Sequence, residues 1–281
     1  MREELTIGLA QWLSEPGALE ANLAQAIGLL EQLAGAGCDL IALPELWPCG
    51  YDTRTLPKDA TDAAEPLDGP RTKLLAESAR ELGVWLAAGS VPELDGNRVF
   101  NTSLLFSRGG DLVASHRKVH LYGDAERKGF VAGDRLTTLE TDELGTVGLC
   151  ICFDGDFPEV ARAMGARGAR LVISPAAYPA ADAGWWDRLY PANALLNAQW
   201  WVLTNQAGTN GDLTILGASK VVSPFGETCA EAPRANAGET PPTATVVAKV
   251  RFKEEIENAT EGLSEMRSTR RPELYETEGT R

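Results

Sequence analysis

The sequence predicts an α/β protein in which two β-sheets pack face to face and helices cover both outer faces, a four-layer α-β-β-α sandwich. Short apolar runs alternate with segments whose apolar residues recur at helical spacing, and hairpins interrupt this alternation. The second half repeats the first half's order of elements, though not its residues. With 281 residues, of which 44% are hydrophobic, the chain can bury one sizeable core, so we expect a single domain over residues 1–281.

The first half predicts a β-α-β opening followed by hairpins. Leu23, Ile27, Leu30 and Ala34 recur at helical spacing between two apolar runs. A second predicted helix then leads into a third strand. Two more predicted strands follow, separated by the turn Arg108-Gly109-Gly110. The predicted strands cover residues 5–10, 40–43, 84–88, 99–106 and 111–115, and the second helix covers 71–82.

The second half repeats the scheme after a polar stretch at 117–134. Pro158 starts one predicted helix and a second covers 185–198. The predicted strands cover residues 146–150, 171–174, 201–205, 213–218, 220–222 and 245–250. Residues 231–242, rich in Pro, Ala and Gly, predict a loop. We expect the charged tail from Arg251 to be exposed or to pack on a partner.

Charge and apolar patterning exclude several classes of function. Forty acidic and 26 basic residues give a net charge of -14, which argues against nucleic acid as a partner. The start of the chain carries acidic residues and no apolar run of signal-peptide length, and no later run is long enough to cross a bilayer. We therefore expect no membrane association and a cytoplasmic location. Five cysteines, an odd number, predict at least one free thiol.

Cys152 is the candidate nucleophile because it lies between an apolar strand and a predicted helix that begins at Pro158. Such a turn exposes a side chain and directs free backbone N–H groups toward the same point. The alternative is that Cys152 is a small core residue. Glu45 directly follows the apolar run at 40–43, where α/β proteins collect ligand groups, and Lys118 follows another predicted strand. Taken singly, each could be an ordinary surface residue.

Other catalytic arrangements find less support. The sequence has no Gly-x-Ser-x-Gly motif and no phosphate-binding Gly-x-x-x-x-Gly-Lys motif. His116 and His120, its only histidines, lie four residues apart and could bind zinc from one helix face, as in a metallohydrolase. The residues between them lack the glutamate that such an enzyme needs, and this segment reads as strand and loop. A scaffold protein with a degenerate site is a further alternative.

Three segments together resemble, in order, the signature blocks of the nitrilase superfamily of carbon–nitrogen hydrolases. They are Leu43-Pro44-Glu45 with Gly50-Tyr51, Arg117-Lys118-Val119-His120-Leu121, and Cys150-Ile151-Cys152-Phe153-Asp154 with Phe157-Pro158-Glu159. The resemblance covers roughly residues 7–250. It implies the nitrilase-like sandwich, a homodimer or higher homo-oligomer, no cofactor and no metal.

The same resemblance implies residue roles and a small-molecule amide substrate. Cys152 would be the nucleophile, Glu45 the general base and later acid, Lys118 the stabiliser of the tetrahedral intermediate, Glu126 a second carboxylate that positions substrate and base, and Phe153 the source of one backbone N–H. The expected reaction is hydrolysis of a small amide to a carboxylic acid and ammonia through a cysteine thioester. Candidate residues of the substrate pocket are Tyr51, Asp156, Ala177 and Tyr178.

Departures from the family pattern concern specificity. The Cys-Trp-Glu pattern of true nitrilases and the Arg-Arg-Trp of N-carbamoyl amino-acid hydrolases are absent, so an amidase is favoured over these two alternatives. Asn193 and Leu196 replace residues that are charged in many relatives. Asp156 stands where some amidases carry Arg: it either disfavours anionic acyl groups or caps the following helix. The tryptophan pairs at 185–186 and 200–201 predict core packing, or else a pocket or dimer face.

Overall fold

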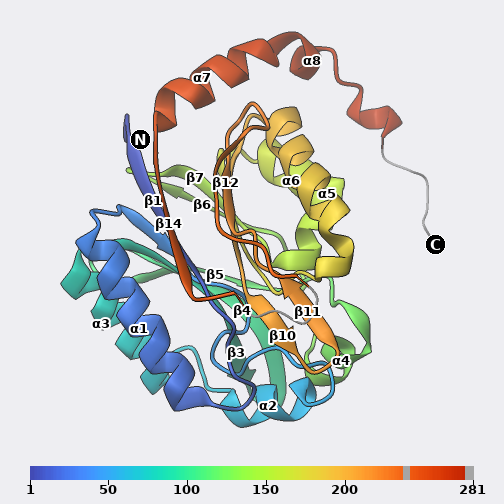
Figure 1. The fold of residues 1–281 in the computed structure, drawn as a ribbon. Coiled ribbons are helices and arrows are strands. Elements are labelled where there is room, and N and C mark those ends of the chain that lie inside the picture. Colours follow the sequence, from blue (N-terminus) through green and yellow to red (C-terminus); the bar gives the residue numbers. More distant parts are fainter. Residues whose placement is uncertain (237–240, 276–281) are drawn as a thin grey trace.

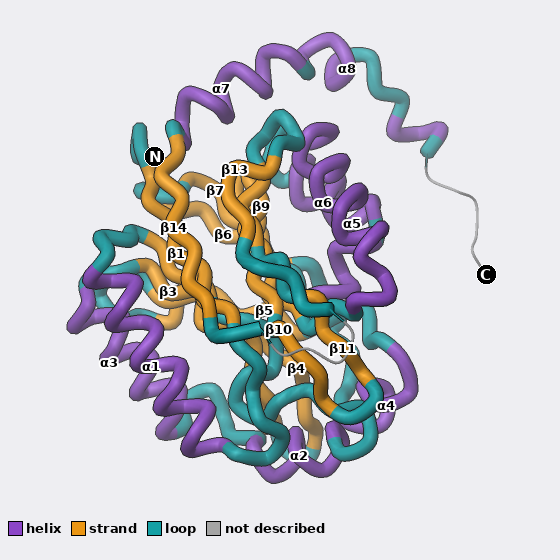
Figure 2. Tube along the Cα trace, viewed as in Figure 1, coloured by secondary structure: helices purple, strands orange, loops and turns teal. Residues whose placement is uncertain are grey.

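The chain forms two six-stranded sheets. Figures 1 and 2 show these sheets at the centre of the molecule. The computed structural model describes residues 1–236 and 241–275. The first sheet has the order β14-β1-β2-β3-β4-β5, and its strands span Leu5–Gln11 (β1), Leu40–Ala42 (β2), Trp85–Asp95 (β3), Arg98–Phe106 (β4), Leu112–Arg117 (β5) and Ala244–Val250 (β14). The second has the order β13-β12-β9-β8-β7-β6, and its strands span Thr137–Thr141 (β6), Gly145–Leu149 (β7), Leu171–Ala176 (β8), Trp200–Asn205 (β9), Lys220–Val222 (β12) and Thr228–Glu231 (β13).

Three parallel strands lie at the heart of each sheet: β1, β2 and β3 in the first, and β7, β8 and β9 in the second. Parallel strands are stable when both of their faces are covered, which explains why their sequences are almost wholly apolar. Because these strands run parallel, their carboxyl ends meet at one edge of each sheet. Glu45 and Cys152 follow two of those ends, β2 and β7.

Apolar side chains from both sheets fill the space between them. This central cluster includes Leu9 and Leu40 of the first sheet and Leu149 and Ile173 of the second, all 1% exposed or less. On the outer face of the first sheet, α1 (Leu19–Gly35) and α3 (Pro70–Leu82) bury a second cluster. On the outer face of the second, α5 (Pro158–Ala166) and α6 (Ala183–Asn197) bury a third. The predicted α-β-β-α sandwich is confirmed (Figure 1).

Sequence patterning missed several short elements in the body of the molecule. These are α2 (Leu56–Ala63), α4 (Gly123–Gly129), β6, β13 and the strand β10 (Ala207–Asn210), which pairs with β11 (Leu213–Leu216) in a separate hairpin. The predicted loop at 231–242 begins at the end of β13, and its residues 237–240 lie outside the described part of the chain.

The described part of the C-terminal tail contains two α-helices, and the first of them packs on this chain's own body. Helix α7 (Phe252–Gly262) buries Phe252, Ile256 and Ala259, the first two within the central cluster. The expectation that the whole tail from Arg251 is exposed or bound to a partner was therefore wrong for α7. Beyond it, α8 (Ser264–Ser268) buries none of its residues, and the two helices arch over one end of the sandwich (Figure 1).

Across residues 1–236 and 241–275, no helix combines the length and the apolar character that crossing a membrane requires.

Candidate active site

Glu45 is positioned by a close approach between two backbone segments. Gly89 on β3 has a φ of +66°, and a Cβ at this position would lie 2.1 Å from the Pro44 carbonyl oxygen. Only glycine tolerates both the conformation and the contact. The Ser90 N–H donates to the same carbonyl at 3.2 Å, and the Ser90 hydroxyl accepts from the Leu46 N–H at 3.0 Å. This bulge in β3 therefore fixes the loop that carries Glu45.

Glu45 is fully buried, and both carboxylate oxygens accept hydrogen bonds. Oε1 accepts from Lys118 Nζ at 2.8 Å and from Asn101 Nδ2 at 2.8 Å, and Oε2 accepts from the Ala177 N–H at 2.8 Å. Burial raises the pKa of Glu45 above its ordinary value, although the Lys118 ammonium opposes the shift. The result is a fixed carboxyl group that holds a proton more readily than an exposed glutamate does.

Lys118 bridges two carboxylates. Its Nζ also donates to Glu126 Oε1 at 2.7 Å, and the side chains of Lys118, Glu45 and Glu126 are all inaccessible to solvent. The Tyr51 hydroxyl donates to Glu126 Oε1 at 2.7 Å and the Tyr122 N–H to Oε2 at 2.8 Å. Burial acts to lower the pKa of Lys118, but the carboxylates of Glu126 and Glu45 outweigh it and hold that pKa well above its ordinary value. Lys118 is therefore a fixed positive charge.

Cys152 occupies the first position of a tight 3₁₀ turn, Cys152–Asp156, directly after β7. Its φ of +46° is uncommon for a residue with a side chain and marks a backbone held in place by its surroundings. Asn193 of α6 donates to the Gly155 carbonyl at 2.9 Å and secures the turn. Burial, together with the negative charge of Glu45, raises the pKa of the Cys152 thiol well above its ordinary value, whereas Lys118 acts to lower it. The charges of Glu45 and Lys118 therefore both act on the Cys152 thiol, and this thiol is protonated in the free enzyme.

Asp154 ties the lysine segment to the cysteine turn. One of its oxygens lies 3.1 Å from His116 Nε2, and the other lies 2.9 Å from His120 Nδ1 and accepts the His120 N–H at 2.8 Å. Burial acts to raise the pKa of Asp154, but the hydrogen bonds from the two histidines lower it below its ordinary value. Both histidines are thus engaged by a carboxylate that aligns Lys118 with Cys152, a structural role that sequence patterning did not assign to them.

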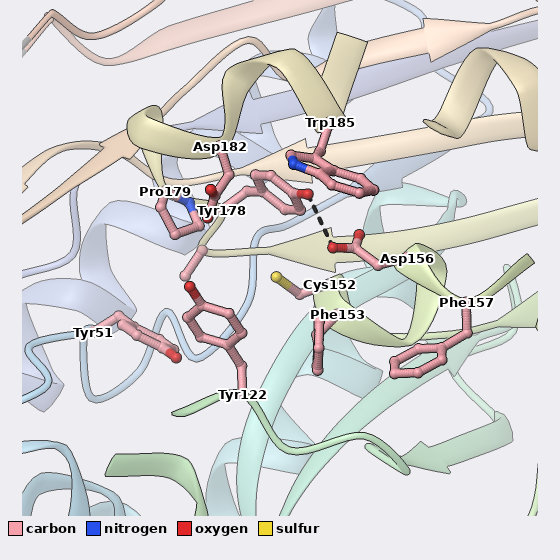
Figure 3. A pocket seen from close by; sticks show the side chains of 11 residues that line it. Tyr51, Tyr122, Cys152, Phe153, Asp156, Phe157, Tyr178, Pro179, Asp182 and Trp185 are labelled. Atoms are coloured by element: carbon pink, nitrogen blue, oxygen red, sulfur yellow. Dashed lines mark hydrogen bonds between the residues drawn. The ribbon is translucent and has the colours of Figure 1, made fainter. Parts of the chain in front are cut away.

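A pocket of about 340 Å³ opens above this cluster (Figure 3). Cys152 reaches it with 6% of its surface exposed, and its sulfur points into the space between Tyr122, Tyr178 and Asp156. All four pocket residues expected from the sequence, Tyr51, Asp156, Ala177 and Tyr178, line it. The remaining lining residues, which sequence analysis did not identify, are Tyr122, Phe157, Pro179, Asp182 and Trp185, together with the ring of Phe153. Phe153 was expected to contribute its backbone N–H alone, so that expectation was too narrow.

The three residues that depart from the family pattern, Asp156, Asn193 and Leu196, differ in their distance from the pocket: only Asp156 lines it. Asp156 does not cap α5: its carboxylate accepts the Tyr178 hydroxyl at 3.0 Å, and α5 has no side-chain cap. Asn193 supports the cysteine turn, and Leu196 is 43% exposed and lies away from the pocket lining. Of the four adjacent tryptophans, 186, 200 and 201 are fully buried, as predicted, whereas Trp185 is 61% exposed at the pocket.

Comparison with known proteins gives a consistent result. The carbon-nitrogen hydrolase family model matches residues 6–256. The omega-amidase of Xenopus tropicalis is 33% identical over 238 residues, 80% of this chain and 83% of that protein. The chloroplastic omega-amidase of Arabidopsis thaliana is 34% identical over 238 residues, 81% of this chain but 64% of that protein's own length.

Solved structures agree with this assignment. A Saccharomyces cerevisiae protein of branch 10 of the nitrilase superfamily superimposes with a TM-score of 0.81 at 28% identity, covering 94% of this chain and 95% of its own. An amidase from Nesterenkonia sp. gives a TM-score of 0.79 at 26% identity, covering 98% and 97%. The relatives favour amide over nitrile hydrolysis, as the sequence predicted. The chain therefore belongs to the carbon–nitrogen hydrolase family and is a hydrolase of non-peptide C–N bonds.

Proposed function

We propose that this protein hydrolyses small primary amides to a carboxylic acid and ammonia, with Cys152 as nucleophile, Glu45 as general base and acid, and Lys118 as electrostatic stabiliser. The observation that carries the proposal is the buried Lys118 ammonium, held 2.8 Å from Glu45 and 2.7 Å from Glu126 in a cluster whose charges act on Cys152 at the floor of a pocket.

In the first half-reaction, the Cys152 thiol gives its proton to Glu45 while sulfur attacks the amide carbon. The carbonyl oxygen becomes an anion beside Lys118 and the Phe153 N–H, which is free for such a bond at the start of a helical turn. Glu45, now protonated, transfers that proton to nitrogen as the C–N bond breaks and ammonia departs. The product is a thioester on Cys152.

In the second half-reaction, Glu45 takes a proton from water as the oxygen attacks the thioester carbon. The tetrahedral intermediate again places its negative oxygen beside Lys118. The C–S bond then breaks, and the departing sulfur recovers the proton from Glu45 as the carboxylic acid is released. One carboxyl group thus serves both steps, which fits a buried group whose pKa is raised above its ordinary value by burial.

A substrate panel tests the proposal and its alternatives. We expect ammonia release from short aliphatic amides to exceed release from the matched nitriles and N-carbamoyl compounds by about tenfold or more. Variants of the Nesterenkonia amidase form complexes with acrylamide and with butyramide, which supports small acyl groups for this enzyme. Colorimetric ammonia measurement over the panel checks this. Faster release from the nitriles would support the nitrilase alternative.

Glu126 is proposed to position substrate and base, and Glu126→Gln tests that role. We expect kcat to fall by about 10- to 100-fold with a smaller change in KM, because the variant loses the second negative charge that fixes Lys118. Steady-state kinetics on one small amide check this. A near-normal kcat would confine Glu126 to a structural role, and Glu140→Gln, a change at an exposed glutamate on β6, controls for the loss of one charge.

A homodimer and a cytoplasmic location are two further parts of the proposal. The exposed apolar side chains of Leu195 and Leu196 on α6 support a self-association surface, and size-exclusion chromatography with light scattering tests it. Five cysteines without disulfides support a reducing compartment.

A further inference from the structure

The charges that line the active-site pocket are all negative. Asp156 and Asp182 contribute carboxylates, and none of the described lining residues is Lys, Arg or His. Lys118, the nearest cation of the site, already contacts Glu45 and Glu126. A pocket of this kind repels an anionic acyl group and attracts a cationic one.

Asp156 is held in place for such a contact. The hydroxyls of Tyr178 and Tyr190 lie 3.0 Å and 3.1 Å from its two oxygens and orient it at the pocket (Figure 3 shows the first contact). In the described part of the chain, no basic side chain forms a salt bridge with Asp156. Burial raises the pKa of Asp156 to about 6, although both tyrosines and Lys118 oppose the shift. The carboxylate is therefore ionised at pH 7 but incompletely compensated by the protein.

Aromatic rings form the rest of the wall. Phe153 stands edge-on to both Tyr122 and Phe157, with ring centroids 5.2 Å and 5.1 Å away. Trp185 leaves 61% of its surface exposed at the pocket, a large apolar area for a bound ligand to cover. Aromatic faces attract ammonium groups, so these rings and the carboxylates favour the same kind of ligand.

We infer that the preferred substrate is a small primary amide whose acyl chain carries a positively charged amine, with the ammonium group bound between Asp156 and the aromatic wall. This inference rests on the proposed function. The leaving group of a primary amide is ammonia, which is too small to span the pocket, so recognition falls on the acyl chain. Asp156 lies in the same tight turn as Cys152, so we expect a short acyl chain to separate the amide group of such a substrate from its ammonium group.

Three amides of matched length test the inference. 4-Aminobutanamide carries an ammonium group where pentanamide carries a methyl group and the monoamide of glutaric acid carries a carboxylate. For the wild-type enzyme, we expect kcat/KM to rank cationic, then neutral, then anionic, with about tenfold or more between the first two, because a charged hydrogen-bonded contact is shielded from water there. In Asp156→Asn, the cationic-to-neutral ratio should fall about tenfold.

Two further variants control the comparison. Asp142→Asn removes the same charge from an exposed turn outside the pocket and should leave the ratio within twofold of the wild type. Asp182→Asn, at the other carboxylate of the pocket lining, should lower the ratio by a few-fold. Holding the charge of Asp156 away from water costs free energy in the folded protein, and Asp156→Asn removes that cost. We therefore expect this variant to keep the thermal unfolding temperature of the wild type. An unchanged temperature separates a change in specificity from misfolding.

The pH dependence provides an independent readout. The cationic-to-neutral ratio should fall as the pH drops from 7 to 5, because Asp156 becomes protonated with a pKa of about 6 while the substrate amine stays charged. The other titratable groups that act on Asp156 are Tyr122, Tyr178, Tyr190, Cys150, Cys152, Lys118 and Asp182. Neither the tyrosines nor the cysteines nor Lys118 ionise in this range, since the pKa of each is raised.

The outcomes separate the two proposals. If the wild type hydrolyses pentanamide as fast as 4-aminobutanamide, or prefers the glutaric monoamide, the inference on substrate charge is wrong while amide hydrolysis stands. An unchanged ratio in Asp156→Asn likewise overturns the role of Asp156. If none of the three amides releases ammonia although Cys152 is labelled by iodoacetamide, the proposed function fails and the inference fails with it.

Discussion

Replacing Cys152 with alanine should lower kcat for a small amide by about 10⁴-fold or more. In the proposed mechanism, no other group forms the thioester intermediate that splits the reaction into two easier steps. The fold should survive. Only one sulfur atom is removed from a side chain at the pocket floor, and the turn keeps its hydrogen bonds from Asn193 and Tyr190. Ammonia release measures activity, and circular dichroism with thermal unfolding measures the fold.

Mass spectrometry identifies the attacking thiol directly. Wild-type enzyme quenched during turnover should carry an acyl adduct on the peptide that contains Cys152. Cys150 and Cys49 are the rival thiols, and burial raises the pKa of each, to about 12 for Cys49. Both are at most 1% exposed, so neither should react. An adduct on either would overturn the assignment, and Cys150→Ala is the matched control that should still form the adduct on Cys152.

The sequence predicted where the candidate catalytic residues lie better than it predicted the pocket around them. Glu45 and Cys152 each follow an apolar parallel strand, so local patterning alone places them at strand ends, and the family blocks link them to Lys118. Pocket residues such as Tyr122, Asp182 and Trp185 come from loops and a helix start whose positions depend on tertiary packing. The signal that pointed to Trp185 was its pairing with Trp186, but a pair does not reveal that one ring is buried and the other exposed.

Helix α4, which the sequence analysis missed, lacks an apolar stripe of its own. Helix α4 has glycine at both ends and charged residues in between, and it buries Glu126 alone. Its formation depends on contacts made elsewhere, since Glu126 accepts hydrogen bonds from Lys118 and Tyr51. Helix α2 is similarly short and packs against α4. Such helices are stabilised by their neighbours rather than by propensity, so periodicity could not predict them.

Strand β3 shows how a functional constraint conceals an element. The predicted strand ended at Ala88, because Gly89 and Pro92 are typical strand breakers. The structure continues to Asp95, with a register shift between Ala87 and Ser90. At this bulge, Gly89 admits the Pro44 carbonyl and Ser90 binds the loop that carries Glu45. The residues that disguise the strand are the same ones that position the catalytic candidate.

Glu45→Gln should lower kcat by about 10³-fold or more, which makes it the most damaging change after loss of the thiol. The thiol of Cys152 has a raised pKa, and without Glu45 it loses its proton acceptor. The leaving nitrogen also loses its proton donor, so both half-reactions slow. Glutamine keeps the shape of glutamate, but Glu45 accepts hydrogen bonds on both oxygens, and the amide –NH₂ would face a donor, either the Ala177 N–H or Lys118 and Asn101.

That mismatch carries a cost of about 1 to 3 kcal/mol in the free energy of unfolding, so thermal unfolding must accompany the kinetics. A folded Glu45→Gln enzyme with kcat above about a tenth of the wild-type value would contradict the role, because one acid–base group typically contributes about 10²- to 10⁴-fold. Asn101→Ala separates chemistry from packing. It removes one hydrogen bond to the same oxygen but leaves the carboxylate and Lys118 in place, so it should reduce kcat far less than Glu45→Gln while lowering the stability by a comparable amount.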